Sequence, residues 1–194
     1  MIPRTAAETV KMLARGYPVV AVTGPRQSGK TTLVRAAFPQ KPYVSLEDPD
    51  QREFAQDDPR RFLGRFGDGA VLDEVQRCPA LFSYLQGRVD ENRRSGLFIL
   101  TGSQQFGLLS GVTQTLAGRV GFVRLLPFSL PELQAAAQAP TDLDELLYRG
   151  QYPPLYDRDV SPLHWHADYV TTYVERDVRQ MVNVQDLTVF QRFI

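Results

Sequence analysis

One segment of eight residues constrains the fold of this chain more than any other. It has the spacing Gly-x-x-x-x-Gly-Lys-Thr and consists of Gly24-Pro25-Arg26-Gln27-Ser28-Gly29-Lys30-Thr31. An apolar, β-branched run at residues 18–23 precedes it, and a helix-forming run at residues 30–38 follows it. A strand, a glycine-rich loop and a helix in this order are typical of a phosphate-binding loop.

The residue types in this loop suit the phosphates of a nucleotide. Gly24 and Gly29 allow backbone conformations that residues with a Cβ resist, so that successive N–H groups can surround phosphate oxygens. The positive end of the dipole of the following helix adds to the positive potential that these N–H groups create. Lys30 can reach the β- and γ-phosphates, and the Thr31 hydroxyl can ligate Mg²⁺. We expect the loop and the adjacent Thr32 to bind the nucleotide; a glycine-rich turn without a ligand is the alternative that this context disfavours.

Short apolar segments alternate with helix-forming ones over the first two thirds of the chain. The strands are expected at residues 19–23, 42–46, 70–73, 96–102 and 120–125. Among the helices, one is expected to start at Thr5, where residues 5–8 have capping-box spacing, one to cover residues 47–65 with a break near Pro59, and one to cover residues 104–117. This alternation is the pattern of a parallel sheet with helices on both faces. Beyond it only helices are expected, so we predict an α/β core at residues 1–126, a helical region at 127–184 and the start of a further, truncated segment at 185–194.

An acidic pair follows the third expected strand. Ligands of such sheets bind at the carboxyl ends of the strands, where the phosphate loop also lies. Asp73 can hold Mg²⁺ opposite Thr31, directly or through water. Glu74 can then polarise the attacking water as a general base. The alternative is a solvated acidic turn at the end of a strand.

Three further side chains are candidates for the same site. Ser103, or less favourably Thr101, can hydrogen-bond the γ-phosphate or the attacking water, although a strand-end hydroxyl can also satisfy local backbone. Arg119 precedes the fifth strand and could reach a γ-phosphate in its own site or in that of a neighbouring subunit. A surface arginine is an equally good interpretation of Arg119.

Composition excludes several classes of protein. The 22 basic and 22 acidic residues cancel, so no global field draws the chain to nucleic acid or anionic lipid. Cys78 is the only cysteine, which rules out an intramolecular disulfide and favours a cytoplasmic setting. No apolar run is long enough to span a bilayer. The chain stops at residue 194 in an apolar, helix-like run without a cap, so we expect it to be the front part of a longer protein.

The motifs taken together resemble the AAA+ ATPases. The segments are, in order, residues 23–32, Leu72-Asp73-Glu74-Val75-Gln76, Leu100-Thr101-Gly102-Ser103-Gln104, Leu116-Ala117-Gly118-Arg119 and Pro127-Phe128-Ser129-Leu130. The first three match the Walker A, Walker B and sensor-1 segments of that family. More narrowly, the set resembles a prokaryotic subgroup that joins an AAA+ domain to a C-terminal domain of unknown function, thought to be similar to restriction endonucleases.

The resemblance implies a P-loop NTPase fold with a five-stranded sheet of order 5-1-4-3-2, followed by a small all-helical lid. It also implies ATP and Mg²⁺ as ligands, assembly into homo-oligomers, and a C-terminal domain that is missing here and would contact DNA or a protein. Two departures stand out. Gln151 occupies a position where members often have glycine, and only Arg149 and Arg176 are candidates for a second sensor arginine.

We therefore expect a Mg²⁺-dependent ATPase that couples hydrolysis to movement of the helical part or of a partner. The main alternative is a nucleotide-gated interaction module, DNA-associated or not, with negligible hydrolysis of its own. A small-molecule kinase shares the phosphate loop, but the Asp73-Glu74 pair favours water as the acceptor. GTP is disfavoured because the chain has no Asn-Lys-x-Asp segment.

Overall fold

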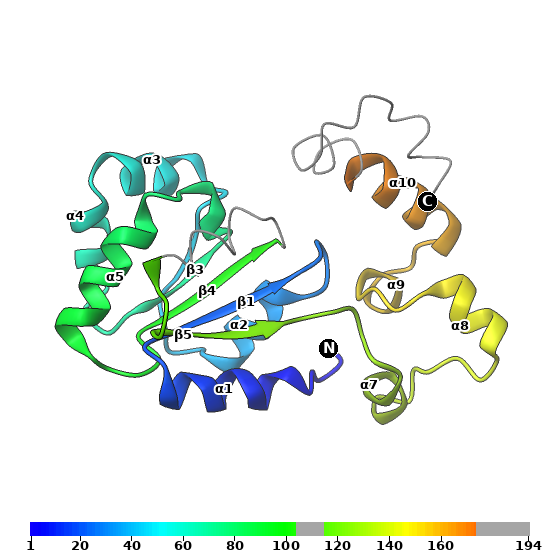
Figure 1. Cartoon of the computed structure of the whole chain (residues 1–194). Helices are drawn as coiled ribbons and strands as arrows, with labels where there is room; N and C mark the ends of the chain where they lie inside the picture. Colours follow the sequence, from blue (N-terminus) through cyan, green and yellow to red (C-terminus); the bar gives the residue numbers. More distant parts are fainter. Residues whose placement is uncertain (104–114, 174–194) are drawn as a thin grey trace. The chain divides into compact units, whose positions relative to one another are not determined.

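A parallel five-stranded sheet forms the centre of the computed structural model, which describes residues 1–103 and 115–173 (Figure 1). Its strands lie in the order β2-β3-β4-β1-β5, which is the predicted order counted from the opposite edge. They are β1 (Val19–Gly24), β2 (Tyr43–Ser45), β3 (Ala70–Asp73), β4 (Phe98–Ser103) and β5 (Val120–Arg124). The five predicted strands are thus all present.

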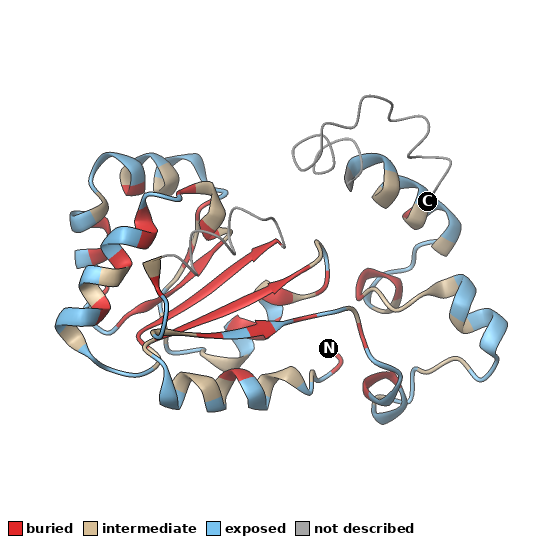
Figure 2. Ribbon diagram, viewed as in Figure 1, coloured by how far each residue is buried: buried red, intermediate tan, exposed pale blue. Residues whose placement is uncertain are grey.

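Helices cover both faces of this sheet because its strands are apolar on both sides. Along β1, Val19 and Ala21 face one buried cluster, whereas Val20 and Val22 face another. The first cluster packs beneath α3 (Pro49–Asp57), α4 (Pro59–Gly64) and α5 (Leu81–Asn92); the second packs against α1 (Ala6–Gly16) and α2 (Lys30–Ala37). Figure 2 shows β1, β3 and β4 buried along their length between these layers, whereas β2 and β5, at the two edges of the sheet, are partly exposed.

Local sequence signals decide where several helices begin. The expected break near Pro59 is confirmed, since α3 ends at Asp57 and the carboxylate of Asp58 accepts from Arg61 N at 3.0 Å to cap α4. Helix α1 begins where the sequence predicts, with Thr5 as its N-cap residue, but the side-chain hydrogen bond of a capping box is absent. Thr5 already has helical backbone angles, φ −60° and ψ −31°, and its side chain makes no capping hydrogen bond. A residue with these angles cannot turn its hydroxyl back to the first free N–H groups.

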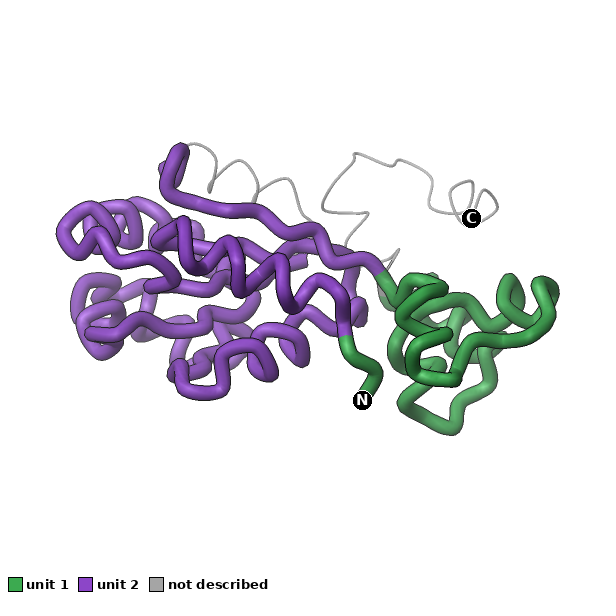
Figure 3. Tube along the Cα trace, turned by 90° about the horizontal axis from the view of Figure 1, so that it is seen from below, with its two compact units in different colours: residues 1–3, 127–194 green, residues 4–126 purple. Residues whose placement is uncertain are grey.

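The chain divides into two compact units, one of residues 4–126 and one of residues 1–3 and 127–194 (Figure 3). The described helices of the second unit are α7 (Leu130–Ala135), α8 (Leu143–Arg149), α9 (Pro154–Asp157) and α10 (Pro162–Tyr173). A small cluster around Phe128 and Leu133 packs this unit, and Trp165 stacks on Tyr169 with ring centres 5.0 Å apart. The helix expected at 104–117 falls mostly outside the described residues, as does the predicted boundary at 184.

No helix in the described ranges is both long enough and apolar enough to cross a bilayer.

Candidate functional site

Four neighbouring strands, β2, β3, β4 and β1, end side by side at one edge of the sheet, and most of the predicted site lies at that edge. The pairing of β1 with β4 puts Gly24 opposite Ser103, and the pairing of β2 with β3 puts Ser45 opposite Asp73. All four residues stand at the carboxyl ends of their strands. The phosphate loop, the acidic pair and the candidate hydroxyl therefore share one edge, as parallel pairing requires.

The phosphate loop has backbone conformations that restrict which residues fit. A Cβ on Gly24 would lie 2.0 Å from the carbonyl oxygen of Leu125, so no side chain can be accommodated there. Gly29, at the start of α2, has φ 91°, and Gln27 has φ 59° although it is not a glycine. Left-handed angles of this kind turn successive N–H groups toward the same side of a loop, which is how anion-binding concavities form.

Lys30 lies folded over the loop that precedes it. Its Nζ donates to the carbonyl oxygens of Pro25 at 2.8 Å and Gly24 at 3.2 Å. Burial lowers the pKa of the Lys30 ammonium below its usual 10.5, and the negative charges of Glu74 and Asp73 oppose that shift. A buried cation with only carbonyl partners gains when an anion binds beside it.

The carboxylate of Asp73 accepts hydrogen bonds from hydroxyl groups on three elements. Thr31 Oγ1, on α2, donates to it at 2.9 and 3.2 Å. Tyr43, on β2, donates to Oδ2 at 2.6 Å, and the Thr101 hydroxyl of β4 donates to Oδ1. Burial, together with the hydrogen bond to Asp73, raises the pKa of Tyr43 well above its ordinary value, so the phenol stays a donor. Asp73 is 5% exposed, and these donors fix its orientation.

Glu74 is held next to Asp73 by a different set of contacts. Its backbone is left-handed, with φ 55° and ψ 43°, at the start of the short helix η1 (Val75–Arg77). The side-chain amide of Gln76 donates to Glu74 Oε2 and, at 3.1 Å, to the Ser103 hydroxyl. One amide thus ties the second carboxylate to the end of β4. A non-glycine residue in this conformation costs about 1 kcal/mol or more and is maintained by its surroundings.

The residues at this edge fit a nucleotide with its magnesium ion. Thr31 and Asp73 offer adjacent hydroxyl and carboxylate oxygens, which are the donors that Mg²⁺ prefers. The Ser28 hydroxyl within the loop is buried and has no hydrogen-bond partner, so an acceptor placed there would satisfy it. The described residues contain no cluster of three or more His, Cys, Asp and Glu side chains, which leaves most ligands of such an ion to phosphate and water.

Arg4 supports the phosphate loop from outside, and the sequence pattern gave no indication of it. Its guanidinium donates to the carbonyl oxygen of Ser28 at 2.7 Å and to that of Leu126 at 2.6 Å. The first acceptor belongs to the loop. The second is the last residue of the core before the chain continues into the second unit.

The structure places Arg119 away from this site, which corrects the expected reach to a phosphate in its own chain. Arg119 precedes β5, and its carbonyl oxygen accepts from the N–H of Val19 at the start of β1. The five residues of β5 put it about 16 Å from the opposite edge, at about 3.3 Å per residue. Its guanidinium pairs instead with Asp90, with an Nη2–Oδ2 distance of 2.9 Å. Residues that precede parallel strands lie at the wrong edge for this role.

The remaining candidates lie as follows. Arg26 in the loop is half-buried, and its positive charge contributes to lowering the pKa of Lys30, whereas Thr32 is exposed in the first turn of α2. In the second unit, the Arg149 guanidinium lies 4.7 Å from the centre of the Tyr156 ring. Arg176 falls outside the described residues.

Two family models match successive parts of this chain. The model of a family described as an AAA domain matches residues 16–134, and that of a domain of unknown function matches residues 140–194. Uncharacterized proteins of Mycobacterium tuberculosis and Mycobacterium bovis are each 33% identical over 183 residues, covering 92% of this chain and 40% of the relative. The chain thus spans about two fifths of the length of these relatives.

Solved structures show the same fold at low sequence identity. A Walker-type ATPase of Pyrococcus abyssi superposes with a TM-score of 0.60 at 16% identity, covering 93% of this chain and 76% of that one. AMPPCP-bound DnaA from Aquifex aeolicus gives 0.50 at 17% identity, covering 89% and 62%. The fold is that of P-loop ATPases, and since the matched family model covers more than half of the residues, this chain belongs to the AAA domain family.

Proposed function

We propose that the chain binds ATP with Mg²⁺ at the carboxyl edge of its sheet and hydrolyses it. The observation that carries this proposal is the 2.9 Å contact between Thr31 Oγ1 and Asp73 Oδ2 beneath the phosphate loop. A hydroxyl and a carboxylate in contact at this position provide the two oxygen ligands that P-loop ATPases use for the metal. Lys30 and the loop N–H groups bind the β- and γ-phosphates.

Binding changes the partners of Lys30. In the structure its ammonium is satisfied by two backbone carbonyls, at 2.8 and 3.2 Å. Phosphate oxygens carry more negative charge than carbonyls, and hydrogen bonds between two charged groups are roughly twice as strong as neutral ones. When ATP binds, the Lys30 ammonium exchanges the carbonyls for phosphate oxygens. The net charge buried at the site falls, because the phosphate oxygens are negative and the ammonium is positive.

A Mg²⁺ ion held by Thr31 and Asp73 would offset the negative charge of the phosphates as the phosphoanhydride bond breaks. Thr31 and Asp73 hold it there, while Tyr43 and Thr101 keep the Asp73 carboxylate turned toward it. Hydrogen bonds to a ligating carboxylate fix its orientation and tune the site.

Glu74 acts as the general base for the water. The water oxygen bonds to the γ-phosphorus, the bond to the bridging oxygen breaks, and the water proton passes to the Glu74 carboxylate, leaving ADP and phosphate. Gln76 keeps Glu74 beside Ser103, whose hydroxyl is within 3.1 Å of the same amide. Ser103 is then positioned to donate to the γ-phosphate.

Arg4 provides a route from the nucleotide to the second unit. Its two acceptors are a loop carbonyl and the carbonyl of Leu126, so a shift of the loop on binding ATP is transmitted to the segment that leaves the core. We include in this proposal a coupling between nucleotide state and the helical unit through that segment.

A nucleotide-gated interaction module is the second candidate, and one contact favours it. The amide of Gln76 already occupies an oxygen of Glu74. If that contact holds the Glu74 carboxylate away from the attacking water when ATP is bound, the site would respond to ATP without turning it over.

Because the relatives are about two and a half times as long as the matched part, larger-scale roles are also proposals. They comprise a C-terminal domain similar to restriction endonucleases that contacts DNA or a protein, assembly into homo-oligomers, and Arg119 as a residue that reaches the site of a neighbouring subunit. Arg119 would have to leave Asp90 for that role.

Steady-state phosphate release, with and without DNA, tests the proposal. Wild-type protein should turn over ATP in the presence of Mg²⁺, and Glu74→Gln should bind ATP with unchanged affinity but lose about 10²- to 10⁴-fold in kcat. Normal turnover in Glu74→Gln would remove Glu74 from the mechanism. ATP binding without phosphate release in the wild type would favour the nucleotide-gated module.

A further inference from the structure

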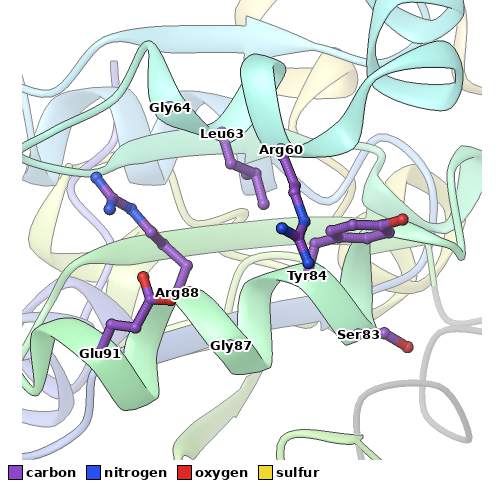
Figure 4. Close-up of a pocket in the computed structure, with 8 residues that line it drawn as sticks. All are labelled: Arg60, Leu63, Gly64, Ser83, Tyr84, Gly87, Arg88 and Glu91. Atoms are coloured by element: carbon purple, nitrogen blue, oxygen red, sulfur yellow. The ribbon is translucent and has the colours of Figure 1, made fainter.

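A pocket of about 560 Å³ lies between α4 and α5 and shares no lining residue with the phosphate site. Figure 4 shows Leu63 of α4 between two arginines: Arg60, which reaches from α4 toward Tyr84, and Arg88, which stands near Glu91 on α5. Pockets of this volume are typical of sites for small molecules. The α4–α5 pocket is therefore large enough for a ligand of its own.

The two arginines in this pocket differ from the arginines Arg65 and Arg94, which follow the same two helices. Arg65 lies over three phenylalanine rings, at 5.3 to 5.8 Å from their centres, and Arg94 pairs with Asp68 at 3.0 Å. By contrast, no hydrogen bond or ion pair joins Arg60 or Arg88 to another residue in the described part of the chain.

Arg88 also carries a buried donor that lacks an acceptor. Its Nε atom is inaccessible to solvent and has no hydrogen-bond partner among the described residues. An unsatisfied buried donor costs about 1–3 kcal/mol, and more on a charged group. A carboxylate or phosphate in the pocket would supply the missing acceptor and could bind the guanidinium through two N–H groups.

Gly87 lies on the exposed side of α5, where it lines the pocket. It is in the interior of that helix, where glycine is about 1 kcal/mol less favourable than alanine. A Cβ there would meet no atom within 4 Å, and the same holds for Gly64, an exposed residue on the opposite wall. Packing therefore does not require glycine at either position, and the space beside both is open to a ligand.

We propose that the α4–α5 pocket binds a small organic anion, a carboxylate or phosphate joined to an apolar group about the size of a phenyl ring. The anion contacts Arg88, with Arg60 at the far end, and the apolar group lies in the space beside Gly64 and Gly87. Leu63 below is only 2% exposed, so the apolar group packs mainly on the ring of Tyr84, which lines the same pocket and is 39% exposed. Glu91 opposes the anion and sets an upper limit on its charge, which disfavours polyphosphates and nucleic acid strands.

Amide NMR spectra of ¹⁵N-labelled protein test this proposal without nucleotide, because glycine amides resonate apart from most others. Phenylacetate and phenyl phosphate are titrated in separate arms, with phenethylamine as the probe of equal ring and opposite charge. We expect one or both anions to shift the Gly64 and Gly87 amides in a saturable way, and the tighter one identifies carboxylate or phosphate as the natural group. Phenethylamine should leave these amides unshifted.

Variants distinguish binding in the α4–α5 pocket from non-specific effects of the anion on the protein. Arg88→Gln should weaken binding of the anion about tenfold, Gly87→Leu should abolish the shift of the Gly64 amide, and Glu91→Gln should strengthen binding by about threefold. Arg15→Gln, an exposed arginine on α1, is the matched control and should change nothing. Gly87→Ala should raise the melting temperature, which shows that position 87 tolerates a side chain. Equal shifts with phenethylamine, no saturable shift with either anion, or unchanged binding in Gly87→Leu would overturn the proposal.

Discussion

Tyr43 donates a hydrogen bond of 2.6 Å to the carboxylate of Asp73, from a strand that the sequence marks only as apolar. The parallel pairing of β2 with β3 sets Tyr43 two residues before the position opposite Asp73, and the length of the phenol covers the difference. An arginine, Arg35, lies over the same ring at 4.8 Å from its centre. Tyr43 is therefore fixed on both sides and can hold Asp73 in turn.

Replacing Tyr43 by phenylalanine removes this hydrogen bond and keeps the ring. We expect the affinity for Mg²⁺ in the presence of ATP to fall about 10- to 100-fold, as is usual when a partner of a metal-ligating group is lost. Metal-dependent ATP binding, titrated with Mg²⁺, measures it. Tyr17→Phe, at a partly exposed tyrosine, is the control. An unchanged Mg²⁺ requirement in Tyr43→Phe would show that the hydrogen bond has no role in the metal site.

The amide of Gln76 can be tested separately from the metal ligands. In Gln76→Ala, Glu74 loses the donor that orients its carboxylate, so kcat should fall about tenfold or more while KM for ATP stays constant. Gln76→Glu places a like charge beside Glu74 and should be at least as damaging. The measurement is phosphate release over a range of ATP concentrations. A rise of kcat in Gln76→Ala would instead mean that the amide restrains the base, as the nucleotide-gated module requires.

The sequence predicted those features that short segments determine. The phosphate loop and the strand Ala70–Asp73 each follow from the chemistry of a few adjacent residues, and both are where they were expected. Tyr43 and Gln76 were missed because their roles depend on the register between strands and on a side-chain rotamer in η1. The only signal in the sequence was the position of Gln76, two residues after Glu74.

At two positions tertiary structure, and not the local sequence pattern, decides which contacts a side chain makes. Thr5 has the spacing of a capping box but lies inside the helical backbone conformation. Arg119 lies next to a strand of the correct sheet but at its amino edge, where Asp90 at the end of α5 takes the guanidinium. Arg4 shows the converse, since a residue with no motif contacts the centre of the loop.

The Arg4 guanidinium should transmit nucleotide binding to the start of the second unit. In the wild type, hydrogen exchange of the backbone at residues 125–130 should change when a non-hydrolysable ATP analogue binds. Arg4→Lys keeps the charge but cannot reach both carbonyls with one planar group, so the change should be reduced by at least half. Arg15→Lys on α1 controls for the loss of a guanidinium. An identical response in Arg4→Lys would rule out this route.

The thiol of Cys78 should report the stability of the core. Cys78 is fully buried, and burial raises its pKa above the usual value, so less thiolate is present at pH 8 than for a free cysteine. Native protein should react with a disulfide reagent only as fast as it opens, and saturating ATP should slow the reaction further by mass action. The absorbance of the released thiolate follows it. Complete reaction within the mixing time, with and without ATP, would contradict the burial of Cys78.

The central claim is that the phosphates of ATP bind to residues 24–31, with Lys30 as the charged contact. The most direct measurement is the equilibrium affinity of a fluorescent ATP analogue, with Mg²⁺ present, for the wild type and for Lys30→Ala, with Lys11→Ala on α1 as the control. The account predicts that Lys30→Ala weakens binding at least about 100-fold, the loss of a charge-assisted contact in a buried site, and that Lys11→Ala binds as the wild type does. An equal affinity of Lys30→Ala and the wild type would contradict it.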